Sequence, residues 1–329
     1  MAKITVLGAG SWALGLSILL NDNGHDVTVW SAVPEEIEVL RENRENPKYL
    51  PGVKISENIK LSTDLEEAAS DRDIIVMAVA SKFTRSTSAK LKGIIKNGQV
   101  IITVAKGFET DTYMILSDVI KSELPNSDVY VLSGPSHAEE VSRRLPTVVT
   151  IAGEDHDTCK YLQDVFSSEV FRVYTSNDML GIELGGALKN VIALAAGIAD
   201  GLGYGDNIKA ALITRGIKEM ARLAVKMGAK SETLYGLTGI GDLIVTCASM
   251  HSRNRRAGIL IGQGKSMDEA VKEVNMVVEG IVSAKSAKAL AEKYDVEMPI
   301  VNEVNKVLFE GASPRESVNN LMLRGKIDE

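Results

Sequence analysis

Short apolar runs alternate with amphipathic stretches through the first half of the chain. The runs are rich in β-branched residues and bounded by Gly, Asp, Asn or Ser, which is typical of strands buried on both faces of a parallel sheet. They predict strands at Ile4–Leu7, Val27–Trp30, Ile74–Val79, Val100–Val104, Val129–Leu132, Val148–Ile151 and Phe171–Tyr174. The stretches between predict helices at Ser11–Asn21, Pro34–Arg44, Lys82–Ile95 and Thr112–Glu123. This βα alternation predicts an α/β, doubly wound sheet of Rossmann type.

The pattern changes after about residue 178, where apolar positions recur with helical spacing. Helical segments are GIELGGALKNVIALAAGIADGLG, KAALITRGIKEMARLAVKMGA, MDEAVKEV, SAKSAKALAEKY and VNEVNKVLF. They predict a second, all-helical C-terminal domain, because almost no β-branched alternation interrupts them. We therefore expect one domain over residues 1–180 and another over residues 181–329, with the functional site between them.

Composition narrows the class of protein. A length of 329 residues suits two domains, and a formal net charge of -7 argues against non-specific nucleic-acid binding. Cys159 and Cys247 fit neither a metal nor a disulfide spacing, and the histidines form no ligand pattern, so we expect no metal. No apolar run is long enough for a membrane span, and the N-terminal apolar stretch is interrupted by Gly8 and Gly10. We expect a cytoplasmic protein with no membrane insertion and no nucleic-acid partner.

The junction between the first strand and first helix carries a glycine fingerprint, Gly8-Ala9-Gly10-Ser11-Trp12-Ala13. In such a motif the first glycine makes a tight turn, and the second lets the backbone approach a pyrophosphate at the start of the helix. A glycine turn occurs at many strand–helix junctions. Here a strand precedes the motif, and a helix and a second strand follow it, which favours dinucleotide binding over residues 1–180.

The end of the second strand reads Ser31-Ala32-Val33, with neither an acid for a ribose hydroxyl nor an arginine for a 2′-phosphate. Glu35 and Glu36 come later and have the appearance of a charged first helical turn. Since Arg41 or Arg44 could fold back, we expect NADP or NAD to bind with limited discrimination and a modest lean to NADP.

Lys189 is the candidate proton donor. Gly186, Ala193 and Gly197 lie on the same helical face, at spacings that give a lysine room or let another backbone approach closely. A solvated surface lysine is the commoner arrangement, but solvated faces rarely carry Gly and Ala in register. A partly desolvated lysine can exchange protons with a substrate oxygen.

A second candidate cluster lies in GLTGIGDLIVTCASMHSRNRRAG, residues 236–258. Its glycines predict a flexible backbone that ends at Asp242, which would hold Lys189 in place. Ser252, Arg253 and Asn254 then offer a hydroxyl, a guanidinium and an amide, followed by two more arginines. Such donors suit a phosphate group, although a basic surface loop has the same composition.

Two loops of the first half follow predicted strands at the carboxyl edge of the sheet, where ligands bind in such folds. One contains Lys106, and the other contains Gly134, Ser136 and Ala138. Both can also be read as ordinary turns and helix caps. His137 lies in the second loop, and we interpret it as a cap or packing residue.

Together these segments resemble the bacterial-type NAD(P)-dependent glycerol-3-phosphate dehydrogenase family over nearly the whole chain. The resemblance rests on GAGSWA (8–13), AKGF (105–108), SGPSHAEEV (133–141), ELGGALKNVIALAAGI (183–198), GLTGIGDL (236–243), HSRNRRAG (251–258) and VVEG (277–280). It implies reversible reduction of dihydroxyacetone phosphate to sn-glycerol 3-phosphate for glycerophospholipid synthesis. The chain departs from the family pattern at Ser31-Ala32-Val33, where members often carry a basic residue. We expect a small phosphorylated substrate and a homodimer.

The resemblance also implies roles for individual residues. Lys189 would be the catalytic proton acceptor. The substrate-binding residues would be Lys106, Gly134, Ser136, Lys189, Asp242, Ser252, Arg253 and Asn254. The cofactor-binding residues would be Gly8, Gly10, Ser11, Trp12, Lys106, Ala138, Arg253, Val277 and Glu279.

Two alternatives remain open from the residues themselves. One is a related two-domain dehydrogenase of a β-hydroxyacid or a sugar phosphate. The other is a non-catalytic nucleotide-binding sensor. The Ser252–Asn254 cluster with Lys106 favours a phosphate ester, and a sensor has no need of a proton donor such as Lys189.

Overall fold

The computed structural model describes residues 1–326, which form two compact units. Unit 1 comprises residues 1–109 and 114–179, and unit 2 comprises residues 110–113 together with the chain from residue 180 onward. Each unit is described by itself below.

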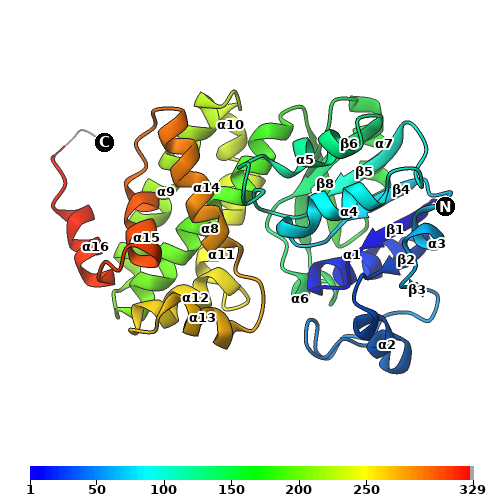
Figure 1. Ribbon diagram of the computed structural model, residues 1–329, viewed down its shortest axis with the longest axis horizontal. Helices are drawn as coiled ribbons and strands as arrows, with labels where there is room; N and C mark the ends of the chain where they lie inside the picture. Colours follow the sequence, from blue (N-terminus) through cyan, green and yellow to red (C-terminus); the bar gives the residue numbers. More distant parts are fainter. Residues whose placement is uncertain (327–329) are drawn as a thin grey trace. The chain divides into compact units, whose positions relative to one another are not determined.

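Unit 1 is built on one eight-stranded sheet with the order β3-β2-β1-β4-β5-β6-β7-β8 (Figure 1). The strands are β1 (Lys3–Leu7), β2 (Asp26–Trp30), β3 (Lys60–Ser62), β4 (Ile74–Met77), β5 (Gln99–Thr103), β6 (Ser127–Ser133), β7 (Thr147–Ala152) and β8 (Phe171–Ser176). The order in which successive strands are added to the sheet reverses between β1 and β4, which are parallel to each other. Doubly wound sheets bind ligands at such a switch point. The predicted Rossmann-type sheet is confirmed.

The sheet departs from the prediction in two places. β7 runs antiparallel to β6, with Leu132 opposite Ile151, so the sheet is not parallel throughout. The reversal follows from the short connection that leaves β6, contains only a one-turn helix, and returns the chain to the neighbouring position. The prediction also missed β3, a three-residue edge strand too short to show a periodic pattern.

Helices cover both faces of this sheet. They are α1 (Ser11–Asp22), α2 (Pro34–Asn43), α3 (Leu65–Ala69), α4 (Thr84–Lys90), α5 (Leu116–Glu123), α6 (Ala138–Val141) and α7 (His156–Phe166), with a 3₁₀ turn at Ser81–Phe83. Alternate residues of the strands serve opposite faces, so that Ile4 and Val6 join the core with α1 and α7, while Leu7 joins the core with α5. The buried apolar runs seen in the sequence follow from this double coverage.

Two predicted helices are shorter than expected. The one predicted from Lys82 to Ile95 spans only Thr84–Lys90, and the chain turns after it at Gly93, which has a φ of +81°. The one predicted from Thr112 begins at Leu116. Before it, residues 109–114 form a tight reversal in which the Glu109 amide donates to the Met114 carbonyl.

The described part of unit 2 is helical throughout. Its helices are α8 (Met179–Gly201), α9 (Asp206–Lys226), α10 (Ser231–Leu234), α11 (Asp242–Ala248), α12 (Arg253–Gly262), α13 (Met267–Val274), α14 (Glu279–Lys293), α15 (Pro299–Phe309) and α16 (Pro314–Met322) (Figure 1). The all-helical second half predicted from the sequence is confirmed.

The segment predicted as flexible backbone before Asp242 is ordered instead. Leu237–Gly241 forms a π-helical turn that continues into α11. Gly239 of this turn serves close packing, because a Cβ there would overlap the backbone of Leu234. A Cβ on Gly185 of α8 would lie 2.7 Å from the Thr238 carbonyl oxygen.

Small residues let α8 and α12 pack backbone against backbone. A Cβ on Gly197 would overlap the Arg255 carbonyl, and one on Gly258 would overlap the Leu194 carbonyl. The sequence left open whether the small residues of α8 make room for a lysine or let another backbone approach. At Gly197 they let another backbone approach. The same packing fixes α8, which carries Lys189, against α12, which carries Arg253 and Asn254.

The expectation that no apolar run is long enough for a membrane span is wrong for one helix among residues 1–326, because α8 is long and apolar enough to cross a membrane. Its apolar window is completely buried within the protein, as expected for a core helix. A bent pair formed by residues 231–248 and 253–262 also meets the length and composition criteria.

Candidate active site

The glycine loop of unit 1 has the geometry of a dinucleotide-binding turn. Gly8 follows β1 with a φ of +126°, and a Cβ there would lie 2.9 Å from the Ala78 carbonyl oxygen. Gly10, the residue before α1, has no heavy atom within 4 Å of its Cβ position, so its open side can accept a ligand. The glycines thus fit a nucleotide pyrophosphate at the amino end of α1.

Ser11 and Trp12 lie in the first turn of α1, which contains no acidic residue. The partial positive charge at this helix end is therefore not offset locally, which favours an anion. Ala138 opens α6 and contacts α1, because a Cβ on Gly15 would meet the Ala138 carbonyl oxygen at 3.5 Å. Ala138 thus lies beside the helix that begins at the glycine loop.

Lys106 and the Gly134 loop lie together at the carboxyl ends of the adjacent parallel strands β5 and β6. The Lys106 ammonium donates to the Gly134 carbonyl oxygen at 2.7 Å, and the Ser136 hydroxyl donates to the same oxygen at 3.0 Å. Gly134 has a φ of +146°, and a Cβ there would lie 2.9 Å from the Val149 Cα. His137 is the residue before α6, but its side chain makes no capping hydrogen bond.

In unit 2 the Lys189 ammonium lies in a buried polar cluster. It donates to Asp242 Oδ1 at 2.6 Å and to the Thr246 hydroxyl at 2.6 Å. The residues are 5%, 1% and 4% exposed. The predicted pairing of Lys189 with Asp242 is confirmed, and the two charges compensate each other in a buried setting.

Thr246 was missed by the sequence analysis. It follows Asp242 by four residues on α11, so both side chains lie on one helix face. The Thr246 hydroxyl donates to the Asp242 backbone carbonyl at 2.6 Å, which leaves its lone pairs for the lysine. The i,i+4 spacing after Asp242 is the signal that could have identified it.

A pair of amides lies close to this cluster along α8. The Asn254 side-chain nitrogen donates to Asn190 Oδ1 at 2.9 Å, and Asn254 Oδ1 accepts from the Gly280 amide at 2.9 Å. Gly280 is close to both, since its Cβ would lie 2.7 Å from the Asn190 carbonyl oxygen. These contacts join α8, α12 and the start of α14, where Glu279 is the first residue. Val277 lies two residues earlier and is partly exposed.

The arginines near residue 253 have different roles. Arg255 donates to Asp200 at 2.8 Å, and Arg256 donates to the Val274 carbonyl at 3.2 Å, so both stabilise the fold. Ser252 is buried and caps α12 by accepting the Arg255 amide at 3.2 Å. Arg253 is the first residue of α12. The three arginines therefore do not act as one phosphate-binding set.

A neighbouring thiol adds no nucleophile to the cluster. Cys247 lies next to Thr246 on α11, and burial raises the pKa of its thiol to about 12. It is therefore neutral at ordinary pH. Among residues 1–326, no group of three or more His, Cys, Asp or Glu side chains is placed to hold a metal ion.

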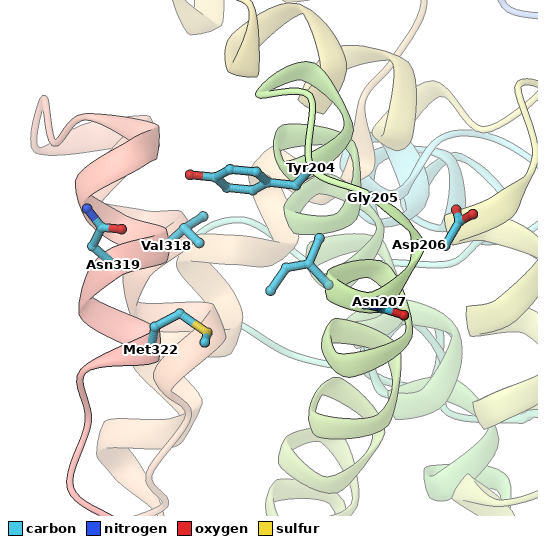
Figure 2. Close-up of a pocket in the computed structure, with 8 residues that line it drawn as sticks. Tyr204, Gly205, Asp206, Asn207, Val318, Asn319 and Met322 are labelled. Atoms are coloured by element: carbon cyan, nitrogen blue, oxygen red, sulfur yellow. The ribbon is translucent and has the colours of Figure 1, made fainter.

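A surface pocket of about 610 Å³ lies elsewhere in unit 2, between the start of α9 and α16 (Figure 2). Tyr204, Val318 and Met322 line it, and Asp206 lies at its edge. None of the predicted site residues borders it, so it does not belong to the candidate active site.

Comparison with known proteins identifies the same family in both halves of the chain. Family profiles described as NAD-dependent glycerol-3-phosphate dehydrogenase N-terminus and C-terminus match residues 3–159 and 178–319. A glycerol-3-phosphate dehydrogenase (NAD(P)+) of Agathobacter rectalis is 61% identical over 326 residues, covering 99% of this chain and 97% of that protein. The corresponding protein of Fusobacterium nucleatum is 59% identical over 328 residues, covering 99% and 98%.

A solved structure agrees with the sequence comparisons. The crystal structure of glycerol-3-phosphate dehydrogenase from Coxiella burnetii has a TM-score of 0.95 and 37% identity, covering 98% of this chain and 99% of that one. The family profiles, the full-length relatives and the fold all agree. This chain therefore belongs to the NAD(P)-dependent glycerol-3-phosphate dehydrogenase family.

Proposed function

We propose that the protein catalyses the reversible reduction of dihydroxyacetone phosphate to sn-glycerol 3-phosphate with NADH or NADPH. The observation that carries this proposal is the buried Lys189–Asp242–Thr246 cluster in a chain of this family. A sensor that only binds nucleotide has no use for a buried ammonium held by two partners. The product would supply the phosphorylated glycerol from which glycerophospholipids are built.

The reaction needs a hydride and a proton. When bound, a reduced nicotinamide supplies the hydride to the ketone carbon. The carbonyl oxygen then gains the electron pair of the C=O π bond and becomes an alkoxide. Lys189 Nζ donates a proton to this oxygen as the charge develops, and in the reverse direction it accepts the proton from the hydroxyl group. Asp242 and Thr246 hold the ammonium in place for this proton transfer.

The residues of each unit have distinct tasks in this proposal. In unit 1, Gly8, Gly10, Ser11, Trp12 and Ala138 bind the dinucleotide. Lys106, Gly134 and Ser136 bind substrate, and Lys106 also contacts the cofactor. In unit 2, Ser252, Arg253 and Asn254 bind the phosphate ester. Arg253, Val277 and Glu279 add contacts to the dinucleotide.

The substrate is best tested by following nicotinamide absorbance with purified protein. We expect rapid loss of NADH absorbance with dihydroxyacetone phosphate and recovery of sn-glycerol 3-phosphate as the product. Oxidation of a β-hydroxyacid or a sugar phosphate at a higher kcat/KM would favour a related dehydrogenase. Binding of NADH without any turnover would favour the sensor.

We further propose that the protein works in the cytoplasm as a homodimer. Cys159 and Cys247 are both buried free thiols, which supports a reducing compartment. Light scattering of the purified protein tests the assembly, and fractionation of the cells that produce it tests the location.

A further inference from the structure

The end of β2 carries an acid that the sequence does not place there. Glu36 lies on α2, five residues beyond Ser31, and its Oε2 accepts a hydrogen bond from the Ser31 hydroxyl at 2.6 Å. Ser31 directly follows β2 and is buried. The helix therefore folds back so that a carboxylate lies at the strand terminus.

This strand terminus adjoins the glycine loop. The Gly8 amide donates to the Trp30 carbonyl at 2.7 Å, and Trp30 is the residue before Ser31. In dinucleotide-binding sheets an acid at this point accepts a hydrogen bond from the adenosine ribose, whereas a 2′-phosphate requires a cation. Glu36 supplies the acid.

The backbone at the same place offers little to a phosphate. The Val33 amide donates to the Ser31 hydroxyl at 3.1 Å, and the Glu36 amide donates to the Val33 carbonyl at 3.1 Å. Pro34, the first residue of α2, has no N–H to donate. Glu35 and Glu36 also lie in the first turn of α2. Their negative charges make this helix end unfavourable for a phosphate.

The two arginines that could have folded back are directed elsewhere. Arg44 contacts Glu57 with a distance of 2.8 Å from Nε to Oε2, and it also donates to the Ile59 carbonyl at 3.0 Å. Arg41 donates to the Leu61 carbonyl at 3.1 Å. Both guanidinium groups thus secure the segment around β3.

From this geometry we propose that Glu36, oriented by Ser31, selects NADH over NADPH. The carboxylate accepts a hydrogen bond from the ribose hydroxyls of NADH and repels the 2′-phosphate of NADPH. The inference rests on the proposed function and reverses the lean toward NADP drawn from the sequence. That lean assumed no acid at this strand end.

The test compares Glu36→Gln with Glu35→Gln, a matched control that removes the same charge one residue away on an exposed position. Dissociation constants for NADH and NADPH are measured by nicotinamide fluorescence, and kcat/KM for each cofactor is measured with dihydroxyacetone phosphate. Melting temperatures show that each variant is folded.

We expect the unmodified protein to bind NADH at least about tenfold more tightly than NADPH. Glu36→Gln should reduce this ratio by about tenfold, chiefly by improving NADPH binding, whereas Glu35→Gln should change it by less than about threefold. Ser31→Ala, which frees Glu36, should reduce the ratio partly. A preference for NADPH, an unchanged ratio in Glu36→Gln, or equal shifts in both glutamine variants would overturn the proposal.

Failure of the proposed function gives a different result. Selective NADH binding that depends on Glu36, without reduction of dihydroxyacetone phosphate, would support the selectivity and refute the substrate. If the unmodified protein bound neither nucleotide, both proposals would be refuted.

Discussion

At the scale of single residues, the chemistry depends on one buried ammonium and on the side chains that hold it. Lys189 and Asp242 are neighbours in space although 53 positions separate them in the chain. The sequence allowed this pairing to be predicted because an isolated lysine on a face of small residues needs a counter-charge. It did not reveal Thr246, or the amide pair Asn190–Asn254, because neither residue type is unusual on a helix.

Replacement of Lys189 should remove the proton donor and leave nucleotide binding intact. We expect Lys189→Met, which keeps much of the side-chain length, to lower kcat by a factor of about 10² or more. The measurement is steady-state turnover beside NADH binding by fluorescence. Lys226→Met, at an exposed position of the same unit, is the matched control. Near-normal turnover of Lys189→Met would make Lys189 structural and Lys106 the next candidate.

Replacement of Arg253 should weaken the phosphate ester specifically. Loss of a bidentate charge-assisted contact costs about 2–4 kcal/mol in transition-state binding, or about 30- to 700-fold in kcat/KM. Arg253→Ala should show this loss with dihydroxyacetone phosphate. Arg256→Ala serves as the control, because its guanidinium donates to a backbone carbonyl and should affect stability more than substrate. An equal loss in both variants would argue against a substrate role for Arg253.

At the scale of elements, strong periodicity predicted most strands and helices, and local packing decided the rest. The eight-residue helix α13 was predicted with its observed bounds, since its apolar positions repeat cleanly. The π-helical turn at Leu237–Gly241 was not, because glycines that permit close backbone packing look the same in sequence as glycines of a mobile loop. The reversed β7 was missed because apolar patterning carries no strand direction.

The close packing of α8 on α12 predicts a strong penalty for an added methyl group. A Cβ on Gly258 would overlap the Leu194 carbonyl, so Gly258→Ala must separate the helices and should cost about 1–3 kcal/mol of unfolding free energy. Chemical denaturation followed by circular dichroism measures this loss. Gly205→Ala is the control, since no heavy atom lies within 4 Å of its Cβ position, and it should cost less than about 1 kcal/mol. Equal costs would show that the helices accommodate the methyl group.

At the scale of the whole molecule, stability should depend on pH through a buried carboxyl group. Glu219 of α9 is 3% exposed and accepts the Ile300 amide at 2.9 Å, at the start of α15. Burial raises its pKa from 4.5 to about 7. The pKa of Glu219 is therefore higher in the folded state than in the unfolded state. The stability that the protonated Glu219 contributes is complete below about pH 4.5 and is lost as the pH rises through about 7.

We therefore expect the unfolding free energy of the unmodified protein to fall as the pH rises from 4.5 to 7. The fall should exceed that of Glu219→Gln by about 3 kcal/mol. Glutamine does not titrate, so the variant removes this slope while the other groups keep theirs. Denaturation curves for both proteins across this range provide the measurement. Parallel pH profiles would contradict the raised pKa.

The activity proposed for the whole molecule is reduction of a phosphorylated ketone. The most direct test of this activity is the ratio of kcat/KM for dihydroxyacetone phosphate to kcat/KM for phosphate-free dihydroxyacetone. Both values are measured on the unmodified protein by loss of NADH absorbance. Because a charge-assisted phosphate contact is worth about 2–4 kcal/mol, we predict that the phosphate ester is favoured by about 30-fold or more. Equal efficiency with the two ketones would contradict the proposed activity.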